Sequence, residues 1–237
     1  MSPILQVCQN GDRGAADHSA APITPEALAA DLAACLAAGA DEAHLHPRDG
    51  SGAESLDAAH IEAAMKALRP LGAPLGVSTQ EGIRVDDGAP AAVASWGEKP
   101  DYASVNLHEA HAPAVRRALD AAGIGCEAGV WTVDDVARLA EGPAPLRILI
   151  EIMEEDPAKA LAEADDVLSA LDRTDASTPR LLHGQGGSAW PLLRRAQALG
   201  LSCRIGFEDV LVGEDGAPVP NNAALVAAAA GGEGGSP

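Results

Sequence analysis

Residues 24–46, TPEALAADLAACLAAGADEAHLH, hold one full repeat of the pattern that decides the fold. Thr24 followed by Pro25 predicts the start of a helix, because a threonine side chain caps the first turn and proline suits the first helical position. Gly39 is expected where this helix gives way to the next segment. The short run 42–46 then predicts a strand. These 23 residues therefore predict one unit of a helix followed by a strand.

The same alternation continues from end to end of the 237-residue chain. Short apolar or β-branched runs predict strands at 4–8, 42–46, 74–78, 102–106, 125–129, 147–152, 179–183 and 202–207. Helix patterns lie at 25–38, 58–68, 91–95, 113–122, 133–139, 157–171, 189–199 and 221–229. Repeated alternation implies a parallel sheet in an α/β protein, and eight units can close into a (β/α)8 TIM barrel.

The length also suits one barrel domain, which typically needs about 250 residues. We expect this domain to cover residues 1–230, with the glycine-rich segment 231–237 as a disordered tail. A doubly wound open sheet is the alternative, but no G-x-G-x-x-G fingerprint follows the first predicted strand.

Composition excludes several classes of partner. The net charge of −19 and an aromatic content of 2% argue against nucleic acid and anionic membranes. No apolar stretch approaches the roughly 20 residues of a membrane span. The four cysteines, Cys8, Cys35, Cys126 and Cys203, are widely spaced and form no CxxC pair. They are expected to be reduced and buried, and with no signal peptide visible we expect a cytoplasmic protein.

Two histidines mark the end of the second predicted strand. In barrel enzymes the reacting groups sit at the carboxyl ends of the strands. His44 and His46 are two positions apart, so their imidazoles share one face of a strand, while Leu45 points the other way. Two neutral imidazoles on one face suit zinc. The alternative is two histidines with separate hydrogen-bonding tasks.

The eighth predicted strand adds an arginine and two acids. Arg204, Gly206 and Glu208 share a face if the strand stays extended that far. Gly206 would then leave space on the inner face, and Glu208 could reach the metal held by the histidines. Such a His2Glu set keeps an open position, as catalytic zinc sites do. Arg204 could bind a substrate carboxylate, or form a salt bridge with a barrel acid.

Further polar residues end the other predicted strands. The candidates that could line the mouth are Ser78, Thr79, Ser104, Asn106 and Asn10. Glu127 and Glu151 lie within predicted strands, where a buried carboxylate without a partner is costly. We therefore expect both glutamates to face the barrel mouth, although either could be structural.

Four short motifs, in this order and spacing, resemble the β-keto acid cleavage enzymes, typified by the 3-keto-5-aminohexanoate cleavage enzyme. They are PITPE at 22–26, AGA at 38–40 with HLHPRD at 44–49, VST at 77–79 and RIGFED at 204–209. The resemblance implies a zinc-dependent barrel that takes a β-keto acid and acetyl-CoA as co-substrate. Its products would be acetoacetate and a shorter acyl-CoA.

The resemblance also implies roles for individual residues. Zinc ligands fall on His44, His46 and Glu208, the acid–base carboxylate on Asp209 beside Arg204, a substrate-binding serine on Ser78 and an active-site glutamate on Glu127. A homo-oligomer, tetramer or dimer, is implied as well. The chain departs from the family pattern at Arg13, where a glutamate is usual, at Gln80, where a glycine is usual, and in a shorter segment after the fourth strand.

Two other functions suit the same residues. A zinc hydrolase of the amidohydrolase type also carries an HxH pair on a barrel strand, but there the pair usually ends the first strand. A non-catalytic metal- or ligand-binding barrel is the third alternative. The pair at the end of the second strand, with Glu208-Asp209 as its partner, favours keto acid cleavage.

Overall fold

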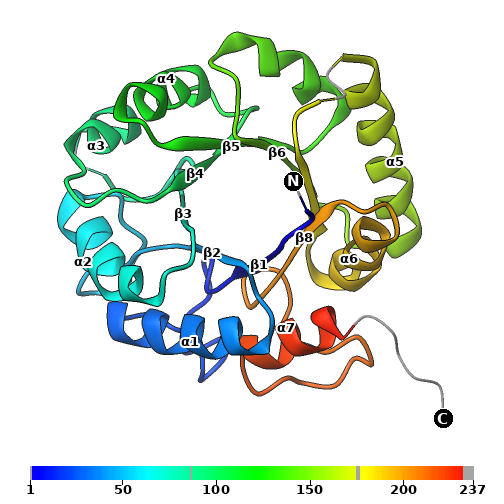
Figure 1. Ribbon diagram of the computed structural model, residues 1–237, viewed down its shortest axis with the longest axis horizontal. Coiled ribbons are helices and arrows are strands. Elements are labelled where there is room, and N and C mark those ends of the chain that lie inside the picture. The colour runs from blue at the N-terminus through cyan, green and yellow to red at the C-terminus, as the bar shows by residue number, and fades with distance from the viewer. Residues whose placement is uncertain (1, 86, 175–176, 232–237) are drawn as a thin grey trace.

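The computed structural model describes residues 2–85, 87–174 and 177–231, and within them eight parallel strands close into a barrel in chain order, β1 to β8 (Figure 1). The strands are β1 (Leu5–Cys8), β2 (Glu42–Leu45), β3 (Leu75–Ser78), β4 (Tyr102–Asn106), β5 (Gly125–Val130), β6 (Arg147–Ile152), β7 (Arg180–Gly184) and β8 (Ser202–Ile205). The predicted (β/α)8 TIM barrel is confirmed.

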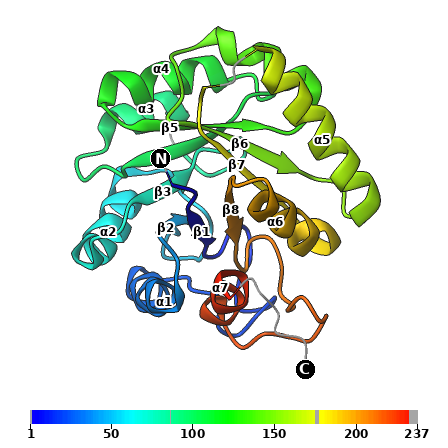
Figure 2. The same ribbon diagram turned by 45° about the vertical axis from the view of Figure 1, so that its right-hand side comes forward.

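Helices form the outer ring of this barrel (Figures 1 and 2). The α-helices are α1 (Pro25–Ala38), α2 (Ala58–Leu68), α3 (Ala89–Ser95), α4 (Ala112–Ala122), α5 (Pro157–Thr174), α6 (Ala189–Ala198) and α7 (Asn222–Ala230). The described residues also form three 3-10 helices, η1 (Arg69–Leu71), η2 (Val133–Glu141) and η3 (Gly186–Ser188). The helical pattern at 133–139 is thus a 3-10 helix, which Thr132 and Asp135 begin with a capping box.

Thr24 and Gly39 act as predicted at the ends of α1. The Thr24 side chain accepts a hydrogen bond from the Ala27 amide, and Gly39 adopts a left-handed conformation with φ of 113°. Its amide bonds the last carbonyls of the helix. Strand β2 therefore begins at a defined point, three residues after the helix turn.

The apolar core lies between the strands and the helices. On β6, Ile148, Ile150 and Ile152 belong to this core, whereas Leu149 and Glu151 line a cavity inside the barrel. This division follows from the period of two in a strand. The barrel interior can therefore be polar while the surrounding layer remains apolar.

A buried polar cluster fills the lower part of the barrel interior. Arg147 pairs with both Glu42 and Glu127, and its guanidinium lies 4.7 Å from the centre of the Tyr102 ring. The Gln6 amide donates to both glutamates and to the Tyr102 hydroxyl. We call these five side chains, Gln6, Glu42, Tyr102, Glu127 and Arg147, the floor cluster, because they lie beneath the mouth of the barrel.

Two predicted strands end earlier than expected. Strand β2 ends at Leu45, one residue before His46, and β8 ends at Ile205. Beyond it, the amides of Asp209 and Val210 both bond the Gly206 carbonyl, which makes a tight turn. The expectation that the strand stays extended to Glu208 is wrong, because this turn closes directly after Ile205.

The other structural expectations concern the cysteines, membrane spans and the tail. All four cysteines are buried and unpaired, as predicted. Among the described residues, no helix is long and apolar enough to cross a bilayer. Residues 232–237 of the expected tail lie outside the described residues.

Candidate active site

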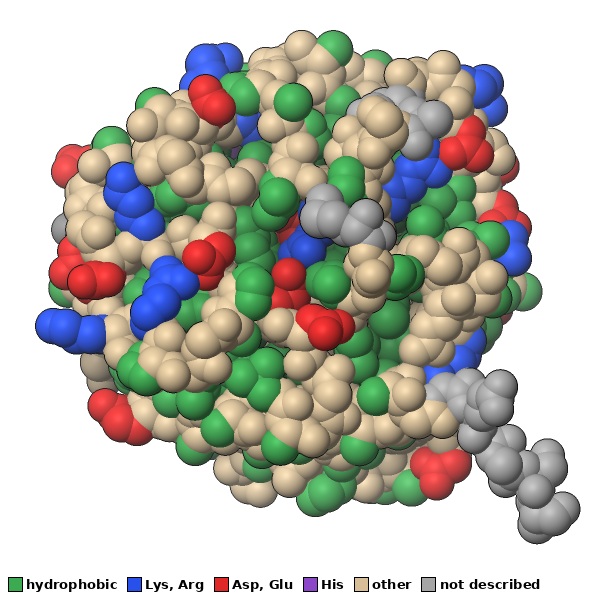
Figure 3. Space-filling view, in the orientation of Figure 1, with side chains coloured by type: hydrophobic (Ala, Val, Ile, Leu, Met, Phe, Trp, Pro, Cys, Tyr) green, Lys and Arg blue, Asp and Glu red, His purple; other side chains and the backbone are tan. Residues whose placement is uncertain are grey.

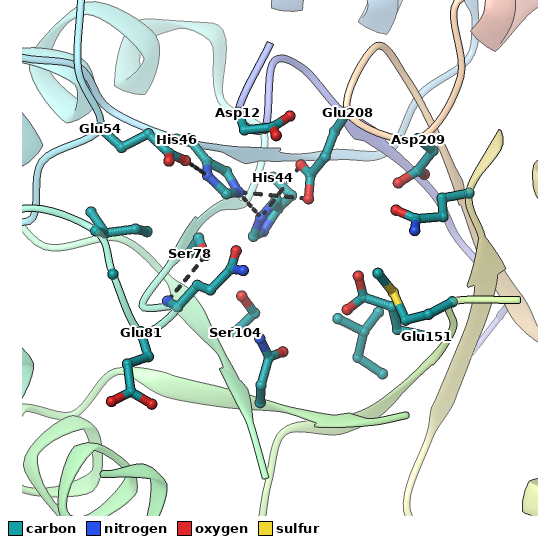
Figure 4. Close-up of a pocket in the computed structure, with 18 of the residues that line it drawn as sticks. Asp12, His44, His46, Glu54, Ser78, Glu81, Ser104, Glu151, Glu208 and Asp209 are labelled. Carbon is teal, nitrogen blue, oxygen red and sulfur yellow. Dashed lines mark hydrogen bonds and ion pairs between the residues drawn. The ribbon is translucent and has the colours of Figure 1, made fainter. Parts of the chain in front are cut away.

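A cavity of about 380 Å³ opens at the carboxyl ends of the strands, and Figure 4 shows many of its side chains. Nine of the residues singled out from the sequence line it: His44, His46, Ser78, Ser104, Asn106, Glu151, Arg204, Glu208 and Asp209. Asp12, Glu54 and Glu81 add further carboxylates to its walls. The predicted groups thus meet in one place, since the strand ends of a parallel barrel share one rim.

His44, His46 and Glu208 converge in this cavity. The two imidazole Nε2 atoms lie 3.2 Å apart, and the Glu208 carboxylate lies 3.7 Å from His44 Nε2 and 3.6 Å from His46 Nε2. Zinc–nitrogen bonds of about 2.0–2.1 Å at a tetrahedral angle would place two nitrogens about 3.3–3.4 Å apart. Glu208 Oε2 is buried and has no hydrogen-bond partner among the described residues. Spacing, donor types and this unpaired oxygen all fit a divalent metal.

Hydrogen bonds hold both the imidazole and the backbone of His46 in place. Its Nδ1 hydrogen-bonds with the Glu54 carboxylate, which leaves Nε2 facing His44 and Glu208. The Asn10 amide bonds both the N–H and the carbonyl of the His46 backbone. A carboxylate behind a ligating histidine sets its tautomer and raises its basicity. The surroundings of His46 are therefore those of a metal ligand.

The turn after β8 brings two carboxylates to one arginine. Arg204 Nη2 donates to Glu208 Oε1 and to Asp209 Oδ1, each at 2.8 Å, and Nε donates to Asp209 Oδ2 at 3.3 Å. Arg204 is 2% exposed. The salt bridge to barrel acids, one of the two roles considered from the sequence, is what the structure shows.

Two glycines allow this turn to pack against β1 and the loop after it. A Cβ atom on Gly206 would lie 1.9 Å from the Cys8 carbonyl oxygen. A Cβ on Gly11 would lie 2.4 Å from Glu208 Cγ, and Gly11 has a φ of 52°. Gly206 was expected to open space between Arg204 and Glu208, but the structure shows it making room for the β1 backbone.

Asp209 lies in a buried site with three partners. Besides Arg204, it accepts a hydrogen bond from the Cys8 thiol at 2.9 Å, and its Oδ1 lies 3.5 Å from His183 Nδ1. Burial alone would raise the pKa of Asp209, but Arg204 and then His183 outweigh it and lower the pKa to about 2. The carboxylate is therefore ionised at neutral pH and faces the cavity beside the candidate metal ligands His44, His46 and Glu208.

The two histidines of the candidate metal site, His44 and His46, have opposite pKa shifts. Burial lowers the pKa of His44 to about 4, so this ring is neutral at pH 7. Burial would lower the pKa of His46 too, but Glu208 and Glu54 raise it to about 9. Burial raises the pKa of Glu208, yet Arg204 and the two histidines hold it well below its usual range. The pKa of His46 therefore lies above neutral pH and that of His44 lies below it.

Three of the predicted site residues do not line the cavity. Thr79 donates to the Ser104 carbonyl at 2.7 Å, which ties the end of β3 to β4. Asn10 is fully buried behind His46. Glu127 was expected at the mouth, but it lies in the floor cluster with Arg147, because its position on β5 pairs with the first residue of β6. Glu151 lies on β6, four residues after Arg147, and it does line the cavity at the mouth.

Sequence reasoning missed the part played by Glu54. It belongs to the irregular loop after β2, where a bridge to Arg48 brings it back toward the strand end. No spacing rule for strands or helices applies to such a loop. The HPRDG segment could signal a turn, but it does not reveal which later residue returns to His46.

Comparison with known proteins identifies the family of this chain. A family model for beta-keto acid cleavage enzymes matches residues 3–232. The chain belongs to the β-keto acid cleavage enzyme family. The resemblance noted from four short motifs is thereby confirmed over nearly the whole chain.

Solved structures show the same fold at low identity. ObcA in a binary complex with oxaloacetate superposes with a TM-score of 0.65 and 20% identity, covering 87% of this chain and 62% of that one. A ternary complex of ObcA with a C4-CoA adduct and oxalate gives 0.65 and 19%, with the same coverage. A type I 3-dehydroquinate dehydratase from Clostridium difficile gives 0.64 and 12%, covering 96% and 90%. This β-keto acid cleavage family member thus spans less than two thirds of the ObcA chains that it matches.

Proposed function

We propose that this chain is a zinc-dependent enzyme that condenses a β-keto acid with acetyl-CoA and releases acetoacetate and a shorter acyl-CoA. The observation that carries the proposal is the ionised Asp209 carboxylate beside the His44, His46 and Glu208 triad, in a cavity open to solvent. Family membership supports a β-keto acid as substrate. The ObcA complexes with oxaloacetate, itself a β-keto acid, and with a CoA adduct support a cavity of this fold that takes both.

The residues would divide the work as follows. Zinc held by the triad would act as a Lewis acid toward the ketone oxygen. Asp209 takes the C2 proton, which lies between two carbonyl groups and is therefore acidic. Arg204 keeps Asp209 ionised until the substrate arrives. Ser78, Ser104 and Asn106 line the opposite rim and would bind the keto acid.

The remaining bond changes follow from the carbanion at C2. It attacks the thioester carbonyl of acetyl-CoA, and the CoA thiolate leaves. The thiolate then adds to the original ketone carbon, the C2–C3 bond breaks, and the proton returns from Asp209 to the carbanion of acetoacetate. Atoms and charge balance without an oxidant or reductant. Glu127 receives no substrate contact in this scheme, because it lies in the floor cluster.

The decisive experiment is an assay of zinc-loaded protein with a panel of β-keto acids and acetyl-CoA, with acetoacetate and the new acyl-CoA measured together. Replacement of Asp209 by asparagine should lower turnover by about 100-fold or more, the usual range for loss of a general base. Zinc content should stay at the parent level, since Asp209 is not in the triad. Hydrolysis of esters or amides with no acyl transfer would contradict the proposal and favour a zinc hydrolase.

A further inference from the structure

Glu151 and His183 form a pair on the wall of the cavity. They are directly opposite each other in the parallel pairing of β6 with β7. His183 Nε2 lies 3.9 Å from the Glu151 carboxylate, and His183 Nδ1 lies 3.5 Å from Asp209. His183 is 1% exposed, and neither ring nitrogen has a hydrogen-bond partner among the described residues. The mechanism above gives neither side chain a task.

Glu151 faces the metal triad across the cavity. Strand β6 is four strands away from β2 in the closed barrel, so the two lie on opposite sides of it. Figure 4 shows Glu151 on the wall away from His44 and His46, with Asp209 on the side between them. A carbon atom that loses its proton to Asp209 would therefore have the triad on one side and Glu151 on the other.

The charge of the cavity makes a second acid useful. Its walls carry the carboxylates Asp12, Glu54, Glu81, Glu151, Glu208 and Asp209. Among the described residues that line it, Arg204 is the one arginine or lysine, and it is already paired with Glu208 and Asp209. A thiolate released into this space would face several negative charges. The groups around Glu151 itself are His183 and Arg204, which lower its pKa, and Glu208 and Asp209, which raise it; burial is the largest effect, and the pKa is raised overall.

We propose that Glu151, whose carboxylate lies 3.9 Å from His183 Nε2, is a second acid–base group that protonates the departing CoA thiolate and later removes that proton again. This inference rests on the function proposed above. In the first step the carboxyl O–H bond breaks and an S–H bond forms as the thioester is cleaved. In the second, the S–H proton returns to the Glu151 carboxylate as sulfur adds to the ketone carbon. Glu151 ends as it began, so the reaction needs no other proton source.

The test separates the carbon step from the thiol step. Deuterium exchange at C2 of the β-keto acid, measured above the uncatalysed rate, reports on Asp209 alone. Formation of the new acyl-CoA reports on the whole reaction. We expect Glu151→Gln to lower acyl-CoA formation by about 100-fold, while C2 exchange and zinc content stay near the parent values. The limb of the pH–kcat profile that belongs to Glu151 should also disappear.

Glu163→Gln on α5 is the matched control, because it makes the same substitution on the exposed helix that follows β6. It should leave both rates unchanged. Acyl-CoA formation by Glu151→Gln at the parent rate would overturn the inference, as would a parallel loss of C2 exchange or an effect confined to the KM of the keto acid. A parent protein that neither exchanges C2 nor forms acyl-CoA would instead overturn the proposed function.

Discussion

The side-chain amide of Asn10 makes two hydrogen bonds to the backbone of His46: Nδ2 donates to the His46 carbonyl and Oδ1 accepts from the His46 N–H, each at 2.9 Å. Strand β2 ends at Leu45, one residue before His46. The two bonds from Asn10 therefore hold the His46 backbone in place of the hydrogen bonds between strands. Asn10 was predicted to bind substrate, whereas the structure places it behind His46, a candidate metal ligand.

Replacing Asn10 with alanine should therefore weaken metal binding. We expect a loss of about 10- to 100-fold in zinc affinity, the range seen when outer partners of a metal ligand are removed. At saturating zinc, the KM for substrate should change little. Competition with a chromophoric chelator measures the affinity. Asn221→Ala, which removes the N-cap of α7, is the control for a comparable loss of hydrogen bonding without a metal effect.

Replacing His46 with alanine should remove most of the bound zinc, because it leaves two of three ligands. Elemental analysis of the purified protein measures this. His60→Ala is the control, since His60 lies on α2 and bonds Ser55 rather than the triad. A His46 variant as rich in zinc as the parent would show that the ligand assignment is wrong.

Zinc binding should release about one proton near pH 7. His46 has a pKa of about 9 in the metal-free chain and must lose its proton to ligate, while His44, with a pKa of about 4, is already neutral. Apparent zinc affinity should thus rise about tenfold per pH unit up to about pH 9. Calorimetry in buffers of different ionisation enthalpy counts the protons. No released proton at pH 7 would contradict this assignment.

Stability of the metal-free chain should show the opposite trend. The folded pKa of His46, about 9, is raised above its usual value. Its contribution to stability is therefore complete below about pH 6.5 and is lost as the pH rises toward 9. Urea unfolding of the chelator-treated protein at pH 6, 7.5 and 9 tests this. The His46→Ala variant should lack this part of the pH dependence.

Replacing Gly11 with alanine should disturb Glu208. The residue has φ of 52°, and the new Cβ would overlap Glu208 Cγ. Gly123→Ala is a matched control, because it has φ of 70° and open space around it. Both should lose about 1 kcal/mol or more of stability through backbone strain. Zinc affinity should fall in the Gly11 variant alone, and equal affinities would show that Glu208 can move away without cost.

We also expect the protein to form dimers or tetramers. Figure 3 shows hydrophobic side chains dispersed among charged ones over the visible face. The large hydrophobic side chains exposed to solvent include Val133, Leu146 and Leu199. Family membership adds to this expectation. Light scattering at micromolar concentration would decide, and a strict monomer would contradict the prediction.

The sequence alone was enough to predict the barrel and the core of its site. Alternation of short strands with capped helices is a local property, and Thr24 and Gly39 set the ends of α1 through bonds within a few residues. The pairing of His44 with His46 follows from the period of two in a strand. Ser78, Ser104 and Asn106 were found because strand ends share one rim.

Tertiary structure decided which polar residues meet and which remain apart. The depth of Glu127 depends on the register of β5 with β6, which places it beside Arg147 rather than at the mouth. Glu54 reaches His46 along an irregular loop, and Glu208 arrives through a turn instead of an extended strand. Strand residues two positions apart share a face but lie at different depths in the barrel. Which of them meets a given partner depends on strand register and on the paths of the loops, and both depend on how the whole chain packs. A local pattern therefore reveals that a side chain points inward, and the closed barrel determines its depth and its partner.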